Sequence, residues 1–386
     1  MSAYRLEVRA GKVLFRQGDA ATTAFLIESG EIEISTGSDG GHKVLGVLGH
    51  GDLLGEMAVI DDSARTATAI ALTDVVLTPI DRAQFAERLD SADPVVRALM
   101  LSQLARYRSV IAQIAGHASP PVRADERPSV YETVALDKIR LESQLREAIE
   151  RRELEIRLQP IIEIATGRIA GFEALTRWTH PERGPVSPAD FIALAEETSL
   201  IMPVGEYVLG EVCAALHEFA ARGNASKFIA VNVSGRQLRD RGFIDHVLHQ
   251  ILAHGVAADR LKIEITESLV LDYAEVAAFI ARCHAAGMRV ALDDFGTGYS
   301  NLGHLHKLRF DTLKLDQGFV RQLDDPRCHA IVRAVVGMAD ALGCDIVAEG
   351  VETDAQLRQL SALNCRYAQG WLVGKPSPID EALRLT

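Results

Sequence analysis

The sequence predicts a multidomain protein in which an all-β roll with a C-terminal helix is followed by a helical linker and an α/β barrel of the TIM-like (β/α)8 type. Three observations predict this. Short β-prone runs separated by glycine and aspartate turns fill about the first ninety residues. A segment rich in proline and charge, 118–128, then interrupts the chain. In the C-terminal half, apolar strand-like runs alternate with helical stretches such as 276–286 and 331–342. The expected domains are therefore 1–117, a linker 118–150, and 151–386.

The N-terminal domain is expected to be a roll or sandwich because its turns recur at regular intervals. Its β-prone runs are 12–15, 24–28, 31–35, 44–48 and 75–80. The stretch 55–67 stands out, since a short helix followed by Arg65 could offer backbone N–H groups and one guanidinium to a phosphate. A surface loop with one solvated arginine explains the same residues equally well.

Two helices are predicted after the roll. The first begins at Asp93-Pro94 and continues through Leu104 to Ile114, where it could cover a pocket of the roll. The second, 136–154, has a short apolar stripe among dense arginine and glutamate. A solvated helix held by i,i+4 ion pairs accounts for these charges, and a dimeric signalling helix remains an alternative.

The predicted barrel strands end in polar side chains of the kind that bind cations. Because the carboxyl ends of parallel strands share one rim of a barrel, these side chains are expected to form an active site there. The adjacent acids Asp293 and Asp294 repel each other when ionised, which favours a cation beside them over the alternative of a helix cap. The strand-end residues are Glu173, Asn232, Glu264, Asp293, Asp294, Lys314, Glu349 and Gln369.

Composition limits the function classes. The chain has 386 residues and a formal charge of −12, which argues against nucleic acid or an anionic membrane as partner. No apolar run has the length of a membrane helix and no signal peptide is evident, so a cytoplasmic protein is expected. The five cysteines fit reduced thiols. His304 and His306 are interpreted as solvated, and Trp178 and Trp371 as packing residues.

The motifs of the C-terminal half resemble the EAL family of cyclic-di-GMP phosphodiesterases from about Leu141 onward. They are Glu173-Ala-Leu, Val231-Asn-Val-Ser, Glu264-Ile-Thr-Glu-Ser, Asp293-Asp-Phe-Gly-Thr-Gly-Tyr-Ser, Lys314-Leu-Asp, Ala348-Glu-Gly-Val-Glu and Gln369-Gly. The resemblance implies hydrolysis of cyclic-di-GMP. Oxygen ligands without clustered histidine or cysteine favour Mg²⁺ or Mn²⁺ over zinc.

Roles follow for the residues of this motif set. Glu173, Asn232, Glu264 and Asp293 would surround one ion, with Asp293 and Asp294 shared toward a second. Lys314 would position the attacking water. By resemblance, Glu349 belongs to the metal–water network and Gln369 to positioning or substrate binding in the same site. Glu267 is expected to act in the site or to anchor the loop after Asp294. The candidate substrate contacts are Gln159, Arg177 and Asp316, the last for a guanine edge.

The stretch around Arg65, with Gly30 and the lead-in 49–56, resembles the phosphate-binding cassette of the cyclic-nucleotide-binding family, over roughly Leu6 to Ile114. The resemblance implies that Arg65 pairs the cyclic phosphate and Glu56 takes the ribose hydroxyl. Gly55 and Ala58 would lend backbone contacts, beside Met57, and Thr66 would lie near the phosphate or base. The chain begins almost directly on the first strand, without the family's usual N-terminal helices.

The resulting hypothesis is a homodimeric phosphodiesterase that converts cyclic-di-GMP to pGpG and is regulated by cAMP or cGMP, with a preference for cAMP. The alternative is a receptor that holds cyclic-di-GMP without turnover and signals to a partner protein. A transcription factor is not supported, because the barrel follows the sensor where a helix-turn-helix would be needed.

Overall fold

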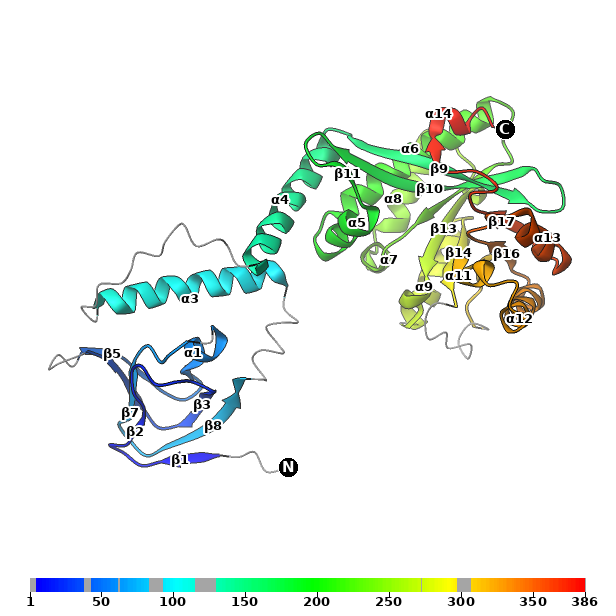
Figure 1. The fold of residues 1–386 in the computed structure, drawn as a ribbon. Coiled ribbons are helices and arrows are strands. Elements are labelled where there is room, and N and C mark those ends of the chain that lie inside the picture. Colours follow the sequence, from blue (N-terminus) through cyan, green and yellow to red (C-terminus); the bar gives the residue numbers. More distant parts are fainter. Residues whose placement is uncertain are drawn as a thin grey trace. The chain divides into compact units, whose positions relative to one another are not determined.

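The computed structural model describes residues 5–37, 43–61, 63–82, 93–114, 130–271, 273–296 and 307–385 (Figure 1). The chain forms two compact units, Met1–Arg140 and Leu141–Thr386. The proline-rich segment 118–128 and both His304 and His306 lie outside the described residues. No helix within the described ranges is long and apolar enough to cross a bilayer.

The N-terminal unit contains two antiparallel sheets, in the strand orders β1-β8-β3-β6 and β2-β7-β4-β5. Buried residues of both sheets form one core, including Ile27, Ile32, Leu54 and Leu77. The all-β prediction is therefore confirmed. The strands are β1 Leu6–Val8, β2 Val13–Phe15, β3 Thr23–Ser29, β4 Ile32–Thr36, β5 Lys43–Leu48, β6 Leu53–Leu54, β7 Thr68–Ala71 and β8 Val75–Asp81, and the short helix α1, Glu56–Ile60, lies between β6 and β7.

The predicted first helix is α3, Pro94–Ile114. The Asp93 carboxylate caps its start by accepting hydrogen bonds from the backbone N–H groups of Val95 and Val96, at 2.8 and 3.3 Å. Arg108 joins α3 to the residue that ends α1, because its Nε and Nη2 lie 2.6 and 2.8 Å from the Asp61 carboxylate. The helix is thereby held against the cassette that contains Arg65.

The second helix, α4, Val130–Glu150, contains the boundary between the two compact units. In the N-terminal unit, Lys138 of α4 pairs with Asp93 at 2.6 Å. In the C-terminal unit, Leu145 and Ala148 are buried in the barrel's hydrophobic core. Part of the stripe that suggested a signalling helix is thus used for packing within the chain.

The C-terminal unit is a closed barrel in the strand order β10-β12-β13-β14-β15-β16-β17-β9, with β9 also pairing β10. All neighbours in it are parallel except β9, which is antiparallel to both β10 and β17. The reason is the short connection from β9 to β10, since a parallel crossover needs a longer segment. The barrel is therefore TIM-like with one reversed strand. Its strands are β9 Leu154–Glu163, β10 Ile169–His180, β12 Phe228–Asn232, β13 Leu261–Thr266, β14 Arg289–Phe295, β15 Thr312–Leu315, β16 Asp345–Ala348 and β17 Tyr367–Gln369.

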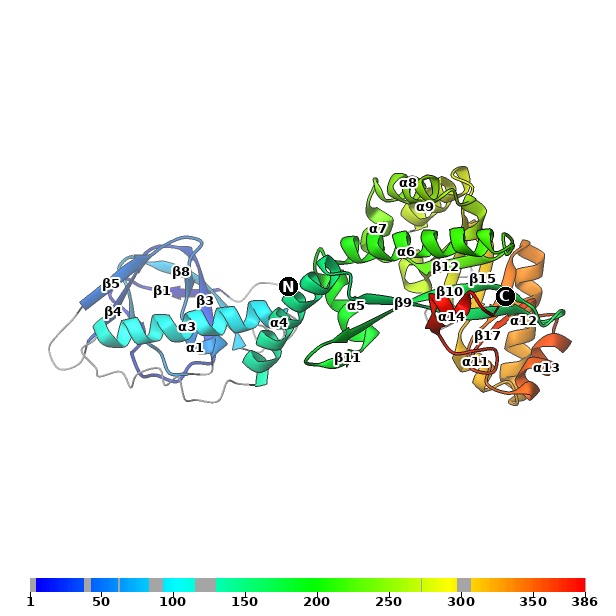
Figure 2. The same cartoon turned by 90° about the horizontal axis from the view of Figure 1, so that it is seen from above.

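Helices surround these strands (Figure 2). The helical stretches expected at 276–286 and 331–342 fall within or beside α9 and α12. Asp325 caps the start of α12 and Gly343, with a left-handed φ of 71°, ends it. The helices are α5 Pro188–Glu197, α6 Ile201–Ala221, α7 Gly235–Arg239, α8 Phe243–His254, α9 Tyr273–Ala285, α11 Gln317–Arg321, α12 Pro326–Leu342, α13 Asp354–Ala362 and α14 Ile379–Ala382; the remaining elements are the 3-10 turns Ala258–Arg260 and Glu267–Leu271 and the strands β11 Gly184–Val186 and β18 Ser377–Pro378.

The two tryptophans differ in their surroundings. Trp178 is 1% exposed and packs edge-on against Phe191, so its interpretation as a packing residue is confirmed. Trp371 is 65% exposed, and the same interpretation is wrong for it. It follows Gly370, directly beyond the end of β17.

Candidate active site

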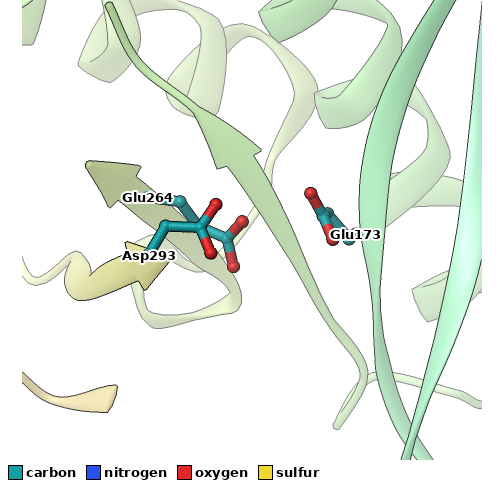
Figure 3. Close-up of side chains that lie close together, drawn as sticks. All are labelled: Glu173, Glu264 and Asp293. Atoms are coloured by element: carbon teal, nitrogen blue, oxygen red, sulfur yellow. The ribbon is translucent and has the colours of Figure 1, made fainter. Parts of the chain in front are cut away.

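Three buried carboxylates from three strands meet at one rim of the barrel. Glu173 of β10, Glu264 of β13 and Asp293 of β14 each offer an oxygen, and these oxygens lie within 4.8 Å of one another. Figure 3 shows the carboxylates of Glu264 and Asp293 side by side, with Glu173 on the opposite side. Strand register causes this meeting, because Asn232 pairs with Glu264 and Thr266 with Asp293 across parallel neighbours. This group could hold a divalent cation.

A second group of acids shares Asp293 with the first. Oxygens of Asp293, Asp294 and Glu349 also lie within 4.8 Å of one another. Successive residues of a regular strand point to opposite faces. Here the pairing of β14 with β15 shifts between Leu292 and Phe295, and Asp294 has a left-handed φ of 55°. This irregularity brings both aspartates to the same site and favours the cation interpretation over the helix cap.

Lys314 of β15 lies at the centre of the acidic cluster and is 1% exposed. Its Nζ is 2.7 Å from Glu349, 2.8 Å from Glu264, 3.0 Å from Asp293 and 3.4 Å from Glu173. Burial would lower the pKa of Lys314, but the surrounding carboxylates raise it well above the usual value. The ammonium is therefore charged at neutral pH.

One ammonium does not neutralise the surrounding acids. Burial raises the pKa of Glu264 well above the usual value and that of Glu349 to about 8. The pKa of Asp294 is also raised, mainly by burial and secondly by the negative charge of Asp293. Burial opposes the ionisation of Glu173, but Lys314, Gln369 and Asn232 lower its pKa. The cluster thus keeps protons that a bound cation would displace.

Amide side chains hold Glu173 in place. Asn232 Nδ2 donates to one of its oxygens at 2.9 Å, and Gln369 Nε2 donates to the other at 2.7 Å. Gln369 Nε2 also lies 3.1 Å from Gln159 Oε1. The Asn232 amide oxygen could serve as a ligand. These three residues are brought to the cluster as the sequence indicated.

The cluster opens into a cavity of about 310 Å³. Gln317, Arg321, Glu352 and Trp371 line it as well, and sequence reasoning missed them. They follow the carboxyl ends of strands by a few residues, so a search extended past each strand end would have found them. The predicted residues that line this cavity are Gln159, Glu173, Asp293, Asp294, Lys314, Glu349 and Gln369.

Five other predicted residues lie outside this lining: Asn232 and Glu264, whose contacts are given above, and Arg177, Glu267 and Asp316. Arg177 lines a separate cavity of about 780 Å³ together with Asn232, and its guanidinium donates to the Thr176 carbonyl. Glu267 accepts a hydrogen bond from Gly296 N–H at 2.7 Å, the loop-anchoring contact that was expected. Asp316 caps α11 through Gly318 N–H at 2.8 Å, and its role at a guanine edge stays a prediction.

The N-terminal unit has its own cavity, of about 410 Å³. Ile111 of α3 also contributes to it. Gly55 has a φ of 74°, and a Cβ there would lie 2.2 Å from Arg65 Nη1, so only glycine fits. The residues predicted to bind a nucleotide all line the cavity: Gly55, Glu56, Met57, Ala58, Arg65 and Thr66.

Arg65 is buried and partly satisfied by the chain itself. Its Nη1 and Nη2 donate to the carbonyls of Gly55 and Thr23, at 2.7 and 2.5 Å, and its guanidinium lies over the Phe15 ring. Its Nε has no hydrogen-bond partner within the described residues. Burial raises the pKa of Glu56 and lowers that of Arg65. An anion in the cavity would supply the missing acceptor.

Comparisons with known proteins match both units. The EAL domain profile matches residues 142–376, and the cyclic nucleotide-binding domain profile matches residues 5–92. The cAMP-bound structure of the EAL enzyme Bd1971 is 31% identical, covers 99% of this chain and 100% of that chain, and superposes with a TM-score of 0.82. Its form with both cAMP and cyclic-di-GMP gives a TM-score of 0.85 at the same identity and coverage.

Curated relatives match the C-terminal unit. The bifunctional diguanylate cyclase/cyclic di-GMP phosphodiesterase MucR of Pseudomonas aeruginosa is 40% identical over 251 residues, which are 64% of this chain and 37% of MucR. A solved phosphodiesterase structure of MucR with cyclic-di-GMP is 40% identical, covers 63% of this chain and 99% of that chain, and has a TM-score of 0.60. The chain spans about a third of the length of the curated relatives it matches.

Proposed function

Because the chain belongs to the EAL domain family and carries a cyclic nucleotide-binding domain before it, we propose that it hydrolyses cyclic-di-GMP to linear pGpG under the control of a cyclic mononucleotide. One observation carries the hydrolase proposal. Two groups of carboxylates share Asp293 around the buried Lys314, at the mouth of a cavity. The relatives named as cyclic di-GMP phosphodiesterases support the choice of substrate.

The donor set fits two hard cations. Glu173, Asn232, Glu264 and Asp293 would hold one, and Asp293, Asp294 and Glu349 a second. Every donor is an oxygen, which suits Mg²⁺ or Mn²⁺. The buried Gln369 Oε1, which lacks a hydrogen-bond partner among the described residues, is an acceptor free for a coordinated water. When bound, the ions would lower the pKa of that water and neutralise a phosphate.

The chain's own residues supply the rest of the chemistry. The water oxygen attacks phosphorus, the bond from phosphorus to the 3′ oxygen breaks, and a 5′-phosphate remains. The Lys314 ammonium offsets negative charge that develops on the phosphate oxygens in the transition state. Once a bound cation has displaced its proton, the Glu349 carboxylate would be able to accept the proton that the water releases. Gln369 and Asn232 keep Glu173 oriented throughout.

The regulatory ligand is proposed to be cAMP. The support is the cavity that the predicted cassette residues line. The Nε of Arg65, which has no hydrogen-bond partner among the described residues, would be a donor for the cyclic phosphate. Solved forms of Bd1971 with cAMP and with cGMP keep both nucleotides open as ligands of this pocket. Arg108 of α3 contacts the Asp61 carboxylate and, at 3.2 Å, the Ala64 carbonyl. Through these contacts a change in the cassette on nucleotide binding would be transmitted to α3.

A homodimer is proposed to form through α3. Five exposed apolar residues of this helix, with the polar Gln103 among them, follow the four-and-three-residue spacing of a coiled-coil seam, and the exposed Leu99 lies outside it. A stripe with this repeat is complementary to its own copy about a two-fold axis. The apolar residues of the seam are Val96, Met100, Tyr107, Val110 and Ile114, and Gln103 is its polar position.

The assay of the proposed activity uses the full chain with cyclic-di-GMP and Mg²⁺ or Mn²⁺, and chromatography of the product. We expect pGpG from the wild type. Glu173→Ala and Asp293→Asn are expected to lose turnover by orders of magnitude while the protein stays folded. Excess Ca²⁺ is expected to inhibit, because its longer and more flexible coordination misplaces the water.

The second candidate function is a receptor that binds cyclic-di-GMP without turnover. It would be favoured by calorimetric binding of cyclic-di-GMP with no pGpG at any concentration of either metal. The complete set of acidic and amide side chains at the site favours turnover. Near-normal activity in Asp293→Asn would contradict the site assignment.

A further inference from the structure

Asp93 and Lys138 form an ion pair that joins α3 to α4. Lys138 Nζ of α4 lies 2.6 Å from Asp93 Oδ2, directly before the first residue of α3. The other carboxylate oxygen of Asp93 accepts the hydrogen bonds from Val95 and Val96 that cap α3. The pKa of Asp93 is lowered, and its hydrogen bond to Lys138 is the first cause. One carboxylate therefore holds both the first turn of α3 and a side chain of α4.

The same helix α3 is attached to the cassette further along its length. Arg108 donates two hydrogen bonds to the Asp61 carboxylate and one to the Ala64 carbonyl. Ile111, less than one turn later, lines the nucleotide cavity. A packed helix shifts as a unit in switching proteins, so a displacement of α3 at Arg108 also displaces its capped first turn. Asp93 therefore moves with the cassette.

On the other side of the ion pair, α4 continues into the barrel unit as one unbroken helix. Leu145, about two turns after Lys138, is 0% exposed and belongs to the barrel core. Arg183 Nε donates to Gln144 Oε1 of α4 at 2.7 Å. Arg183 follows the end of β10, the strand that carries Glu173. A displacement of α4 is therefore transmitted to the strand that holds a predicted metal ligand.

We propose that the Asp93–Lys138 ion pair couples α3 to α4 and thereby sets how strongly a cyclic nucleotide changes turnover at the barrel. This inference rests on the proposed hydrolysis of cyclic-di-GMP under nucleotide control. The pair gives a route from the cassette to the barrel that does not depend on residues 115–129. Its side chains are 41% and 21% exposed, and an ion pair of this kind can change an equilibrium by up to about fivefold.

The test measures the nucleotide response of the full-length protein, defined as the ratio of cyclic-di-GMP turnover with and without saturating cAMP, and again with cGMP. Lys138→Met and Asp93→Asn each remove one charge of the pair, and asparagine can still cap α3. Each variant should move the response toward a ratio of one, by up to about fivefold. Both should still bind cAMP in calorimetry, because neither residue lines the nucleotide cavity.

Two further variants distinguish a coupling contact from a structural one. The double variant Asp93→Asn, Lys138→Met should lose no more of the response than either single variant, because the second substitution has no pair left to remove. Lys138→Arg retains the charge and should keep the wild-type response. Glu147→Gln is the matched control, since it removes an ion pair with Arg151 on the same helix, at 2.5 Å, that does not involve α3.

The possible failures are separable. An unchanged response in both single variants, or an equal loss in Lys138→Arg or Glu147→Gln, would overturn the role of the ion pair and leave the proposed function intact. A double variant that loses more than either single one would also overturn it. A wild type that hydrolyses cyclic-di-GMP without a response to either nucleotide would overturn the ion-pair role together with the proposed nucleotide control.

Discussion

Two buried lysines in the barrel should respond to the same substitution with opposite changes in stability. Lys314 and Lys262 are 1% and 2% exposed, on β15 and β13. Lys314 contacts four carboxylates, as described above. The Lys262 ammonium instead lies 3.3 Å from the Thr312 hydroxyl and 3.8 Å from the centroid of the Phe228 ring. Substitution of each by methionine keeps the length of the side chain and removes the charge.

Lys314→Met should destabilise the metal-free protein. Removal of one partner from a buried ion pair costs about 3 to 5 kcal/mol. In a unit of this size each kcal/mol lowers Tm by about 2 to 4 °C, so a decrease of about 10 °C is expected. Millimolar Mn²⁺ should recover part of the loss, because a cation bound between the carboxylates restores positive charge.

Lys262→Met should stabilise the protein at neutral pH. Burial lowers the pKa of Lys262 from 10.5 to about 8. The unfolded chain then holds this proton more tightly than the folded chain, and the stability of the wild type rises as pH increases from about 8 to about 10.5. The charged form costs about 3 kcal/mol at pH 7, which is the upper limit of what Lys262→Met can recover. The variant should also lose this pH dependence.

The assay is thermal unfolding in EDTA at pH 7 and pH 9.5, followed by tryptophan emission. Both tryptophans lie within residues 141–386, so the signal reports the barrel unit alone. If the Tm values of the two variants shift in the same direction at pH 7, the sign of the stability change does not depend on charged partners, and the reasoning is refuted. If Lys314→Met does not lower Tm, the central role of the Lys314 ammonium in the stability of the cluster is refuted.

Three further predictions address the other sites. Arg65→Ala should weaken cAMP binding at least tenfold in calorimetry, because a charge-assisted contact worth about 1.5 to 3 kcal/mol is lost. The variant should keep basal turnover and lose its response to the nucleotide, and an unchanged cAMP affinity would refute the pocket assignment. Burial raises the pKa of Glu349 to about 8 and that of Glu264 well above normal, so Mn²⁺ affinity should increase from pH 6.5 to pH 8.5. Calorimetry in buffers of different ionisation enthalpy should show the release of protons, and an Mn²⁺ affinity that does not change with pH would contradict this prediction. Tyr107→Asp and Val110→Asp in α3 should convert the dimer to a monomer in light scattering, and a wild type that is monomeric at all concentrations would end the dimer proposal.

The succession of an all-β unit and a strand–helix barrel could be predicted from the amino-acid sequence, together with most residues of the acidic cluster. These properties are local. Turn residues at short intervals define small strands, and a polar side chain at the end of an apolar run belongs to a strand terminus wherever the strand lies. Glu173, Glu264 and Lys314 could therefore be named before their distances were known.

How these residues meet, and which neighbours bury the other side chains, follows from the tertiary structure. The irregular pairing at Asp294 brings two consecutive aspartates to one site, and the short hairpin reverses β9. An apolar or aromatic residue in the sequence indicates that burial of its side chain is favourable, but it does not indicate which neighbour buries it. Leu145 of α4 therefore lies in the barrel core, whereas Trp371, read as a packing residue, lies in water. Such coverage depends on contacts between segments far apart in the chain, and no local pattern encodes them.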